Sequence, residues 1–204
     1  MLRLDQLPPG NSARRPTAWA TRNGKNFLRR GWKYFMAGLQ KKLLAIDTNI
    51  LFDLAQENDF AHTFREVLQE RGYFLKVSPT AFQELVHYAT VRKCAESSTA
   101  LKALQQMKGW GIFPFDLSPA EHAIAAAFSS RLIGKGFLPE GENNDGYILA
   151  ETSLAGIQVL ATRDDHLLGI EPTYLHTQFD EADLMPVAVF HPRKLLAALK
   201  FSKG

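Results

Sequence analysis

Four acidic residues that are far apart in the sequence fall where apolar strands end or where helices begin. They are Asp47, Glu84, Asp145 and Asp164. In open α/β sheets, ligands bind at the carboxyl ends of the strands, and the helices that follow start at the same rim. Two carboxylates ~4 Å apart repel by ~4 kcal/mol at an effective dielectric constant of 20. Four converging acids would therefore raise one another's pKa values or require a cation, and hard oxygen ligands favour Mg²⁺ or Mn²⁺.

Each acid also has a simpler structural explanation. Asp47 and Asp145 could be helix N-caps, which stabilise a helix by about 1 kcal/mol each. Glu84 could be a solvated helix residue, and Asp164 and Asp165 could be turn formers. A shared position at one rim of the sheet is the feature that would favour the metal site over these explanations.

Histidine and cysteine give no separate sign of a metal centre. His87 follows Glu84 by three residues and His166 follows Asp164 by two, so either ring could approach the rim. We favour a surface or packing role for both. The chain has a single cysteine and no Cys/His spacing typical of zinc, which excludes a disulfide framework and a cysteine-rich zinc site.

Short apolar runs that alternate with helical patterns predict an α/β domain with a mostly parallel sheet. Strands are expected at 43–47, 73–77, 112–115, 157–161 and 187–190. Helices are expected at about 48–57, 60–71, 97–108, 118–133 and 144–156, and from Ser78-Pro79 and Pro192. Pro114 limits its strand to a short or edge piece. Ser118 and Glu121 have the spacing of a capping box.

Five motifs in this order resemble those of a known family. They are IDTNILFDL, VSPTAFQELV, NNDGYILAET, VLATRDDHLL and VAVFHPRKLL. Over residues 43–196 the chain resembles PIN-domain nucleases of the compact kind typified by VapC toxins. The resemblance implies a PIN-like α/β/α sandwich, with a mostly parallel central sheet and flanking helices.

The resemblance also implies an activity and a set of functional residues. The activity is Mg²⁺- or Mn²⁺-dependent hydrolysis of RNA by an endoribonuclease, the toxin of a type II toxin–antitoxin pair. The catalytic residues would be Asp47, Glu84, Asp145 and Asp164, of which Asp47, Asp145 and Asp164 would hold the metal. Asn49 and Thr162 would orient carboxylates or water, and Asp165 would be an extra acid nearby. The expected partners are RNA, a cognate antitoxin protein and a second copy of the chain.

Other functions compete with this one. A haloacid-dehalogenase-like phosphatase also has a strand-ending aspartate, but it needs a second one two residues later, where this chain has Asn49. A receiver domain also binds Mg²⁺ through acids at strand ends, but it needs adjacent acids at the end of the first strand, and this chain lacks them. A catalytically inactive PIN scaffold, acting as a nucleic-acid-binding or assembly module, is the most serious alternative.

Charge divides the chain into two parts. Residues 1–42 hold ten Lys or Arg and one acid, a net charge of +9, so the remaining residues carry −6 of the overall +3. We interpret 1–42 as a basic N-terminal arm, mobile or weakly helical, and 43–204 as the nuclease-like domain. Within the arm, Arg29, Arg30 and Lys33 would bind nucleic acid. The alternatives are that its aromatic residues pack on protein, that Met36 is the true start, or that the arm serves membrane binding or targeting.

Hydropathy argues against a membrane protein. No apolar run reaches the ~18 residues that a membrane span needs, and no short apolar segment near the start is typical of a secretory signal. We therefore expect a cytoplasmic protein without a membrane span.

Overall fold

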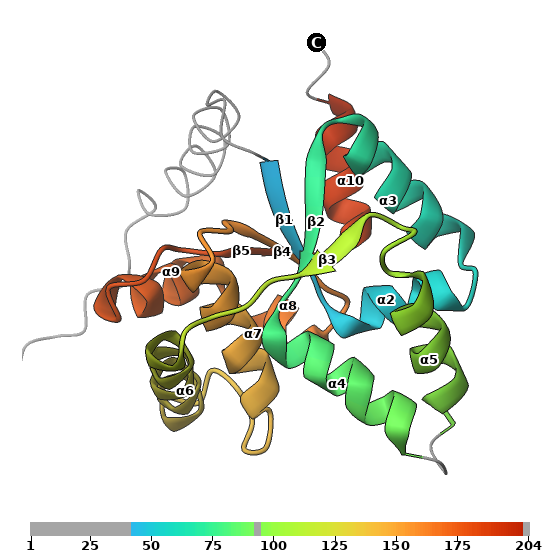
Figure 1. The fold of residues 1–204 in the computed structure, drawn as a ribbon. Helices are drawn as coiled ribbons and strands as arrows, with labels where there is room; N and C mark the ends of the chain where they lie inside the picture. Colours follow the sequence, from blue (N-terminus) through green and yellow to red (C-terminus); the bar gives the residue numbers. More distant parts are fainter. Residues whose placement is uncertain (1–41, 92–94, 202–204) are drawn as a thin grey trace, which may run out of the picture. The chain divides into compact units, whose positions relative to one another are not determined.

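The fold is built on one parallel sheet. The computed structural model describes residues 42–91 and 95–201. Its strands are β1 (Lys42–Ile46), β2 (Tyr73–Val77), β3 (Ile112–Pro114), β4 (Val159–Ala161) and β5 (Ala188–Phe190). They form a five-stranded sheet in the order β3-β2-β1-β4-β5, and each neighbouring pair is parallel. The expected mostly parallel sheet is thus confirmed, and β3 is an edge strand, as Pro114 predicted (Figure 1).

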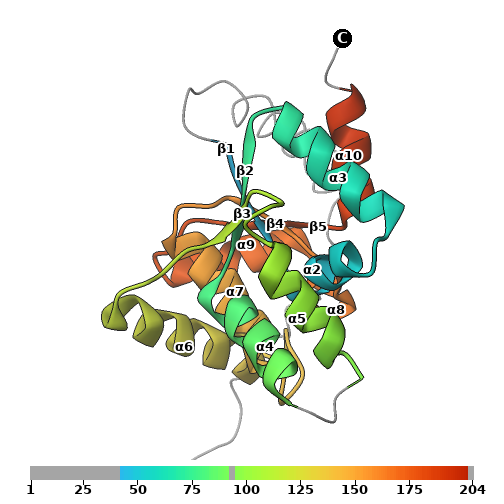
Figure 2. The same ribbon diagram turned by 45° about the vertical axis from the view of Figure 1, so that its right-hand side comes forward.

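Helices flank the sheet on both sides. They are α2 (Thr48–Ala55), α3 (Asp59–Glu70), α4 (Pro79–Thr90), α5 (Ser97–Gln106), α6 (Pro119–Gly134), α7 (Asn143–Leu154), α8 (Asp165–Gly169), α9 (Pro172–Glu181) and α10 (Pro192–Phe201). Helices α3 and α10 lie on one side of the sheet, and α6, α7 and α9 lie on the other (Figures 1 and 2). This arrangement confirms the α/β/α sandwich.

Strand β1 occupies the centre of the sheet, where the direction of winding reverses. Its residues Leu44, Ala45 and Ile46 are buried, as expected for a strand covered on both faces. From β1 the chain adds β2 and β3 on one side and later adds β4 and β5 on the other. The carboxyl ends of β1 and β4 therefore form the switch point at which ligands bind in open α/β folds.

Two of the predicted helix starts are confirmed in detail. The Ser78 side chain accepts a hydrogen bond from the backbone N–H of Ala81 at 3.2 Å, with Pro79 in the first turn. Ser118 and Glu121 make both hydrogen bonds of a capping box, because each side chain accepts from the other residue's backbone N–H. These caps fix where α4 and α6 begin.

Helices α8 and α9 were missed in the sequence analysis. With five residues, α8 is too short to show an apolar period. The cap of α9 is Glu171, whose carboxylate accepts from the backbone N–H groups of Thr173 and Tyr174. Glutamate is not a usual N-cap, although Pro172 at the first helical position was a usable signal.

Several predictions concern residues outside the described part of the chain. They include residues 1–41 of the predicted arm 1–42, with Arg29, Arg30 and Lys33, and the amphipathic pattern over 27–39, whereas Lys42 is the first residue of β1. Across residues 42–91 and 95–201, no helix is both long enough and apolar enough to cross a lipid bilayer.

Candidate functional site

Asp47 stands directly after β1 and caps α2. Its Oδ1 accepts a hydrogen bond from the backbone N–H of Thr48 at 2.6 Å. Its Oδ2 accepts from the Asn49 side-chain amide at 2.7 Å and from the Thr162 hydroxyl at 2.6 Å. The capping explanation is therefore correct, and it does not compete with a site role, because each carboxylate oxygen has two lone pairs.

Thr162, the residue after β4, connects the polar groups at this rim. The side chain is fully buried, and its Oγ1 accepts from the Asn49 amide at 3.0 Å and from the backbone N–H of Asp164 at 2.9 Å. Asn49 in turn accepts from the backbone N–H of Arg163 at 3.2 Å. Asn49 and Thr162 thus hold the Asp47 carboxylate through hydrogen bonds.

Glu84 joins three helices at the same rim. One carboxylate oxygen accepts from the Thr48 hydroxyl on α2 at 2.7 Å. The other accepts from the Asn144 side-chain amide on α7 at 2.5 Å. Glu84, in the second turn of α4, is therefore held between the residue after Asp47 and the residue before Asp145.

Asp145 has a different environment from Asp47. It is the third residue of α7 rather than its N-cap, so the capping explanation offered for it is wrong. The residue is only 8% exposed, and among the described residues its Oδ2 has no hydrogen-bond partner. A buried carboxylate oxygen without a donor is costly unless a cation or water compensates it.

The electrostatics show that the acids lie near one another. Burial raises the pKa of Asp47 to about 6, against the opposing effect of its hydrogen bonds from Thr162 and Thr48. Burial and then the charges of neighbouring acids raise the pKa of Asp145 to about 8. In order of effect, these acids are Asp164, Asp47, Glu142 and Glu84. The rim is a concentration of negative charge that a divalent cation would offset.

Asp164 is the N-cap of α8. Its Oδ1 accepts from the backbone N–H groups of His166 at 2.8 Å and Leu167 at 3.1 Å. As with Asp47, the cap holds the carboxylate at the carboxyl end of its strand. The structure thus brings together all four acids that the sequence singled out.

Two further residues belong to this neighbourhood. The Nδ1 atom of His166 lies 3.9 Å from Asp145 Oδ2, 3.9 Å from Asp164 Oδ1 and 3.8 Å from Glu142 Oε1. Ligand atoms of Glu142, Asp145 and His166 all lie within 4.8 Å of one another, a spacing that could hold a metal. We had favoured a surface or packing role for His166, and Glu142 was missed, although it precedes Asp145 by one helical turn.

Arg163 is a base beside the acidic residues. Its Nε lies 3.1 Å from Asp53 Oδ2, so it forms an ion pair that the sequence analysis did not anticipate. Asp165, the suggested extra acid, is exposed at the start of α8, and its charge acts on His191. Its role stays a prediction.

Close helix packing positions Asp145. A Cβ atom on Gly146 would lie 2.7 Å from Ser129 Cα and 2.5 Å from Ser129 Oγ, so only glycine allows α7 to approach α6 this closely. The Ser129 hydroxyl also donates to the backbone carbonyl of Asn143 at 2.8 Å. In the Asp145-Gly146 pair, the aspartate is the candidate metal ligand and the glycine permits the helix packing that holds the aspartate in place.

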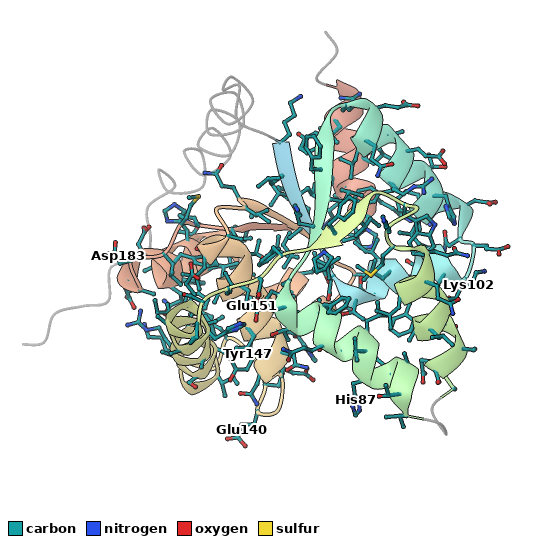
Figure 3. The ribbon with its side chains drawn as sticks, in the orientation of Figure 1. His87, Lys102, Glu140, Tyr147, Glu151 and Asp183 are labelled. Atoms are coloured by element: carbon teal, nitrogen blue, oxygen red, sulfur yellow. The ribbon has the colours of Figure 1, made fainter. Side chains whose placement is uncertain are left out.

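A buried acid ties α7 to α4. Glu151 is 1% exposed, and its carboxylate accepts from the Thr80 backbone N–H at 3.0 Å and from the Thr80 hydroxyl at 2.7 Å (Figure 3). The negative charge lies at the N-terminus of α4, where a helix favours an anion. This contact sets the spacing between the helices that carry Asp145 and Glu84.

Comparison with known families assigns the fold. A family model described as PIN domain matches residues 44–171. The chain belongs to the PIN domain family. The match spans Asp47, Glu84, Asp145 and Asp164, so all four acids of the rim lie inside the PIN domain.

Solved structures similar to this PIN domain come from several bacteria. VapBC2 from Rickettsia felis, bound to a DNA fragment from its promoter, is 14% identical over 72% of this chain and 98% of its own, with a TM-score of 0.49. VapBC-1 from nontypeable Haemophilus influenzae is 14% identical over 74% and 98%, with a TM-score of 0.49. FitAcB from Neisseria gonorrhoeae is 22% identical over 73% and 97%, with a TM-score of 0.44. At identities this low, the substrates and partners of these proteins cannot be assigned to this chain. A comparison with curated proteins found no match.

Proposed function

We propose that this PIN domain is a Mg²⁺- or Mn²⁺-dependent endoribonuclease that hydrolyses RNA phosphodiester bonds. The observation that carries the proposal is the gathering of Asp47, Glu84, Asp145 and Asp164 at the switch point of the sheet. The residues fit a divalent cation, because Asp145 Oδ2 is buried and has no donor within the described chain. An all-oxygen donor set suits Mg²⁺ or Mn²⁺.

The proposed roles follow from the hydrogen bonds. Asp47 and Asp145 would hold the ion, and Asp164 would share it or hold a second one. A bound Mg²⁺ lowers the pKa of a coordinated water and neutralises phosphate charge. Glu84 keeps lone pairs free beside its bonds from Thr48 and Asn144, so it can orient a water. Asn49 and Thr162 hold Asp47 in place.

An acidic rim repels the RNA backbone, so basic groups have to contribute to binding. Arg163 lies beside the rim, and in the arm Arg29, Arg30 and Lys33 would contact phosphates. Deletion of residues 1–35 should then weaken RNA binding and flatten its dependence on salt. An unchanged salt slope would remove the arm from the proposal.

The biological role we propose is that of a toxin in a type II toxin–antitoxin pair, based on the motifs shared with VapC-type proteins. The partners would be an antitoxin protein and a second copy of the chain. Val91 at the end of α4 and Leu101 on α5 are 38% and 48% exposed, which supports a protein contact on these helices.

Substitution of Asp47 tests the activity. Asp47→Asn should keep the circular dichroism spectrum of the wild type and lose at least about 100-fold of its Mg²⁺-dependent RNA cleavage, the scale of removing one strong transition-state interaction. Full activity in this variant would remove the mechanism.

Metal binding separates the nuclease from the inactive scaffold. An ion at 100 times its dissociation constant stabilises the folded state by ~2.7 kcal/mol, which thermal melting detects readily. The wild type should melt higher with Mg²⁺ or Mn²⁺, and Asp145→Asn should lose this response. A wild type that responds to neither ion would support the scaffold instead.

A further inference from the structure

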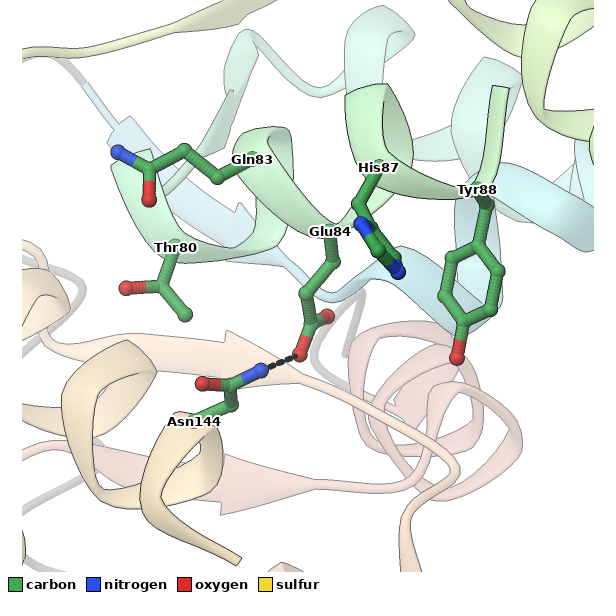
Figure 4. Close-up of a pocket in the computed structure, with 6 residues that line it drawn as sticks. All are labelled: Thr80, Gln83, Glu84, His87, Tyr88 and Asn144. Carbon is green, nitrogen blue, oxygen red and sulfur yellow. Dashed lines mark hydrogen bonds between the residues drawn. The ribbon is translucent and has the colours of Figure 1, made fainter. Parts of the chain in front are cut away.

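A polar groove runs along α4 beside the acidic rim. It has a volume of ≈ 280 Å³, close to the lower end of the range for ligand sites. Its lining residues are Thr80, Gln83, Glu84, His87, Tyr88 and Asn144 (Figure 4). Five of them recur at helical spacing on α4, and Asn144 closes the groove from α7.

The groove and the acidic rim share a wall. Glu84 lines the groove while it accepts the hydroxyl of Thr48, the neighbour of Asp47. Asn144 lines it directly before Asp145. A polymer whose phosphodiester lies at the rim would therefore place an adjoining nucleotide in the groove.

The chemistry of the lining favours a base over a phosphate. Among the described residues no Lys or Arg lines it, and its carboxylate, Glu84, would repel an anion. The remaining groups are amides, a hydroxyl and two rings. A neutral planar group with donors and acceptors along its edge matches that set.

The two rings give the groove a stacking surface. The rings of His87 and Tyr88 are 6.1 Å apart and steeply inclined to each other. Phe52 on α2 contacts the Tyr88 ring edge to face at 5.5 Å, which holds that ring in position. Figure 4 shows both rings at one end of the groove, with Gln83 and Thr80 toward the other.

The amide groups differ in what they can offer. Asn144 already donates to Glu84, so its carbonyl oxygen is the group available to a ligand. Gln83 is exposed and makes no side-chain hydrogen bond within the described chain, so both its donor and its acceptor can read a base edge. Gln83 thus has the chemistry of a specificity-determining residue.

We propose that this groove binds an unpaired nucleobase next to the scissile phosphate, stacked on the His87 ring with the Tyr88 ring at its edge, and read by Gln83. The inference rests on the proposed nuclease function and adds a base preference to it. A base held in this way has to leave a duplex, so single-stranded RNA should be cleaved in preference to paired RNA.

Neutral nucleosides test the groove without involving the reaction. Adenosine, guanosine, cytidine and uridine are titrated into the full metal-free chain, and the side-chain signals of Gln83 and His87 are followed by NMR. At least one nucleoside should shift both signals, and Gln83→Ala should reduce the difference in affinity among the four. If no nucleoside shifts either signal, the proposal is wrong.

Cleavage of single-stranded oligonucleotides that vary at one position gives the second readout. Gln83→Ala and His87→Ala should lower kcat/KM for the preferred base by roughly 5- to 100-fold, the range for loss of one base-edge contact at Gln83 or of one base stack at His87. Val86→Ala is the matched control, because Val86 is exposed on α4 outside the groove. Cleavage with an unchanged base preference in both variants would contradict base binding in the groove but would leave the proposed nuclease activity standing. Nucleoside binding without any cleavage by the wild type would contradict the nuclease activity but would leave base binding in the groove standing.

Discussion

The two aspartates at the centre of the rim, Asp47 and Asp145, differ in their hydrogen-bond partners and in their pKa values. Asp47 accepts hydrogen bonds from Thr48, Asn49 and Thr162, and the pKa of its carboxyl is raised to about 6. Asp145 has one oxygen without a partner in the described chain, and its pKa is raised to about 8. Both are buried, so the difference lies in the hydrogen-bond donors around Asp47 and in the acidic charges around Asp145.

The difference reflects the elements that supply each side of the rim. The Asp47 side is held by adjacent strand ends, since its backbone N–H donates to the carbonyl of Ala161 at 3.1 Å. The Asp145 side is held by helix packing at Gly146 and by the Glu151 contact with Thr80. The Asp47 carboxylate is therefore held by hydrogen bonds to its own oxygens, whereas Asp145 is positioned by contacts elsewhere on α7, which leave one of its carboxylate oxygens available.

Among the substitutions, removal of the Thr162 hydroxyl should have the largest effect on stability. Thr162→Val keeps the shape but leaves Asp47 Oδ2, the Asn49 amide and the Asp164 N–H each without one partner. Buried groups that lose partners cost about 1–3 kcal/mol each, so we expect a loss of roughly 3 kcal/mol in the free energy of unfolding. Urea denaturation would measure it. Thr162→Ser restores the hydroxyl and should recover most of the loss, and a stable valine variant would show that the network does not organise this side.

A methyl group at Gly146 should disturb the Asp145 side. Gly146→Ala places a Cβ 2.7 Å from the backbone Cα of Ser129, so α7 must move. Overpacking of this kind typically costs 1–3 kcal/mol, and we expect about 2 kcal/mol of lost stability together with reduced metal affinity. Denaturation and metal titration would measure the two effects.

Gly134 provides the matched control for that substitution. It ends α6, and a Cβ there would meet nothing within 4 Å. Gly134→Ala should be neutral or stabilise by about 0.5–1 kcal/mol. Equal losses in the two variants would mean that the close approach of α6 and α7 does not position Asp145.

The sequence alone predicted the parts of this site that local patterns encode. The apolar runs located the strands, and the strand ends located Asp47 and Asp164, because parallel strands deliver their carboxyl ends to one rim. Ser78 and Ser118 predicted the starts of their helices, because an N-cap side chain accepts a hydrogen bond from a residue within the next three positions. The five motifs, taken in order, supported the family that the PIN domain match shows.

The parts that escaped prediction depend on contacts between distant residues. His166 approaches Asp145 only because α8 and the start of α7 meet in space, and nothing near His166 in the sequence indicates it. The Glu151 contact with Thr80 spans 71 residues. Gly146 was noticed as part of a helix start, but its clash with Ser129 required the packing of α6 on α7.

Metal-free protein should become less stable as the pH rises. The folded-state pKa values of Asp47 and Asp145, about 6 and about 8, lie above the ordinary value of 3.8. The folded protein therefore holds protons that the unfolded chain has released, a stabilisation complete below about pH 4 and lost as the pH passes 6 and then 8. Between pH 5 and pH 8 this amounts to roughly 5 kcal/mol, so we expect Tm in a chelating buffer to fall by at least about 10 °C, which calorimetry would measure. Saturating Mg²⁺ should flatten the profile, whereas a metal-free Tm that rises with pH would contradict it.

The smallest expected effect compares the same substitution at the two aspartates. Asp145→Asn replaces a carboxyl whose charged form is disfavoured by burial and by neighbouring acids, and it breaks no hydrogen bond at Oδ2. Asp47→Asn also removes a charge, but the new amide would face the donors of Asn49 and Thr162. Without metal, Asp145→Asn should therefore be more stable than Asp47→Asn by about 1 kcal/mol, the net value of a typical hydrogen bond. Urea denaturation of both variants at pH 7.5 with chelator would measure the difference. The reverse order would mean that the open oxygen of Asp145 is satisfied by groups of the chain, which would leave an ion less reason to bind there.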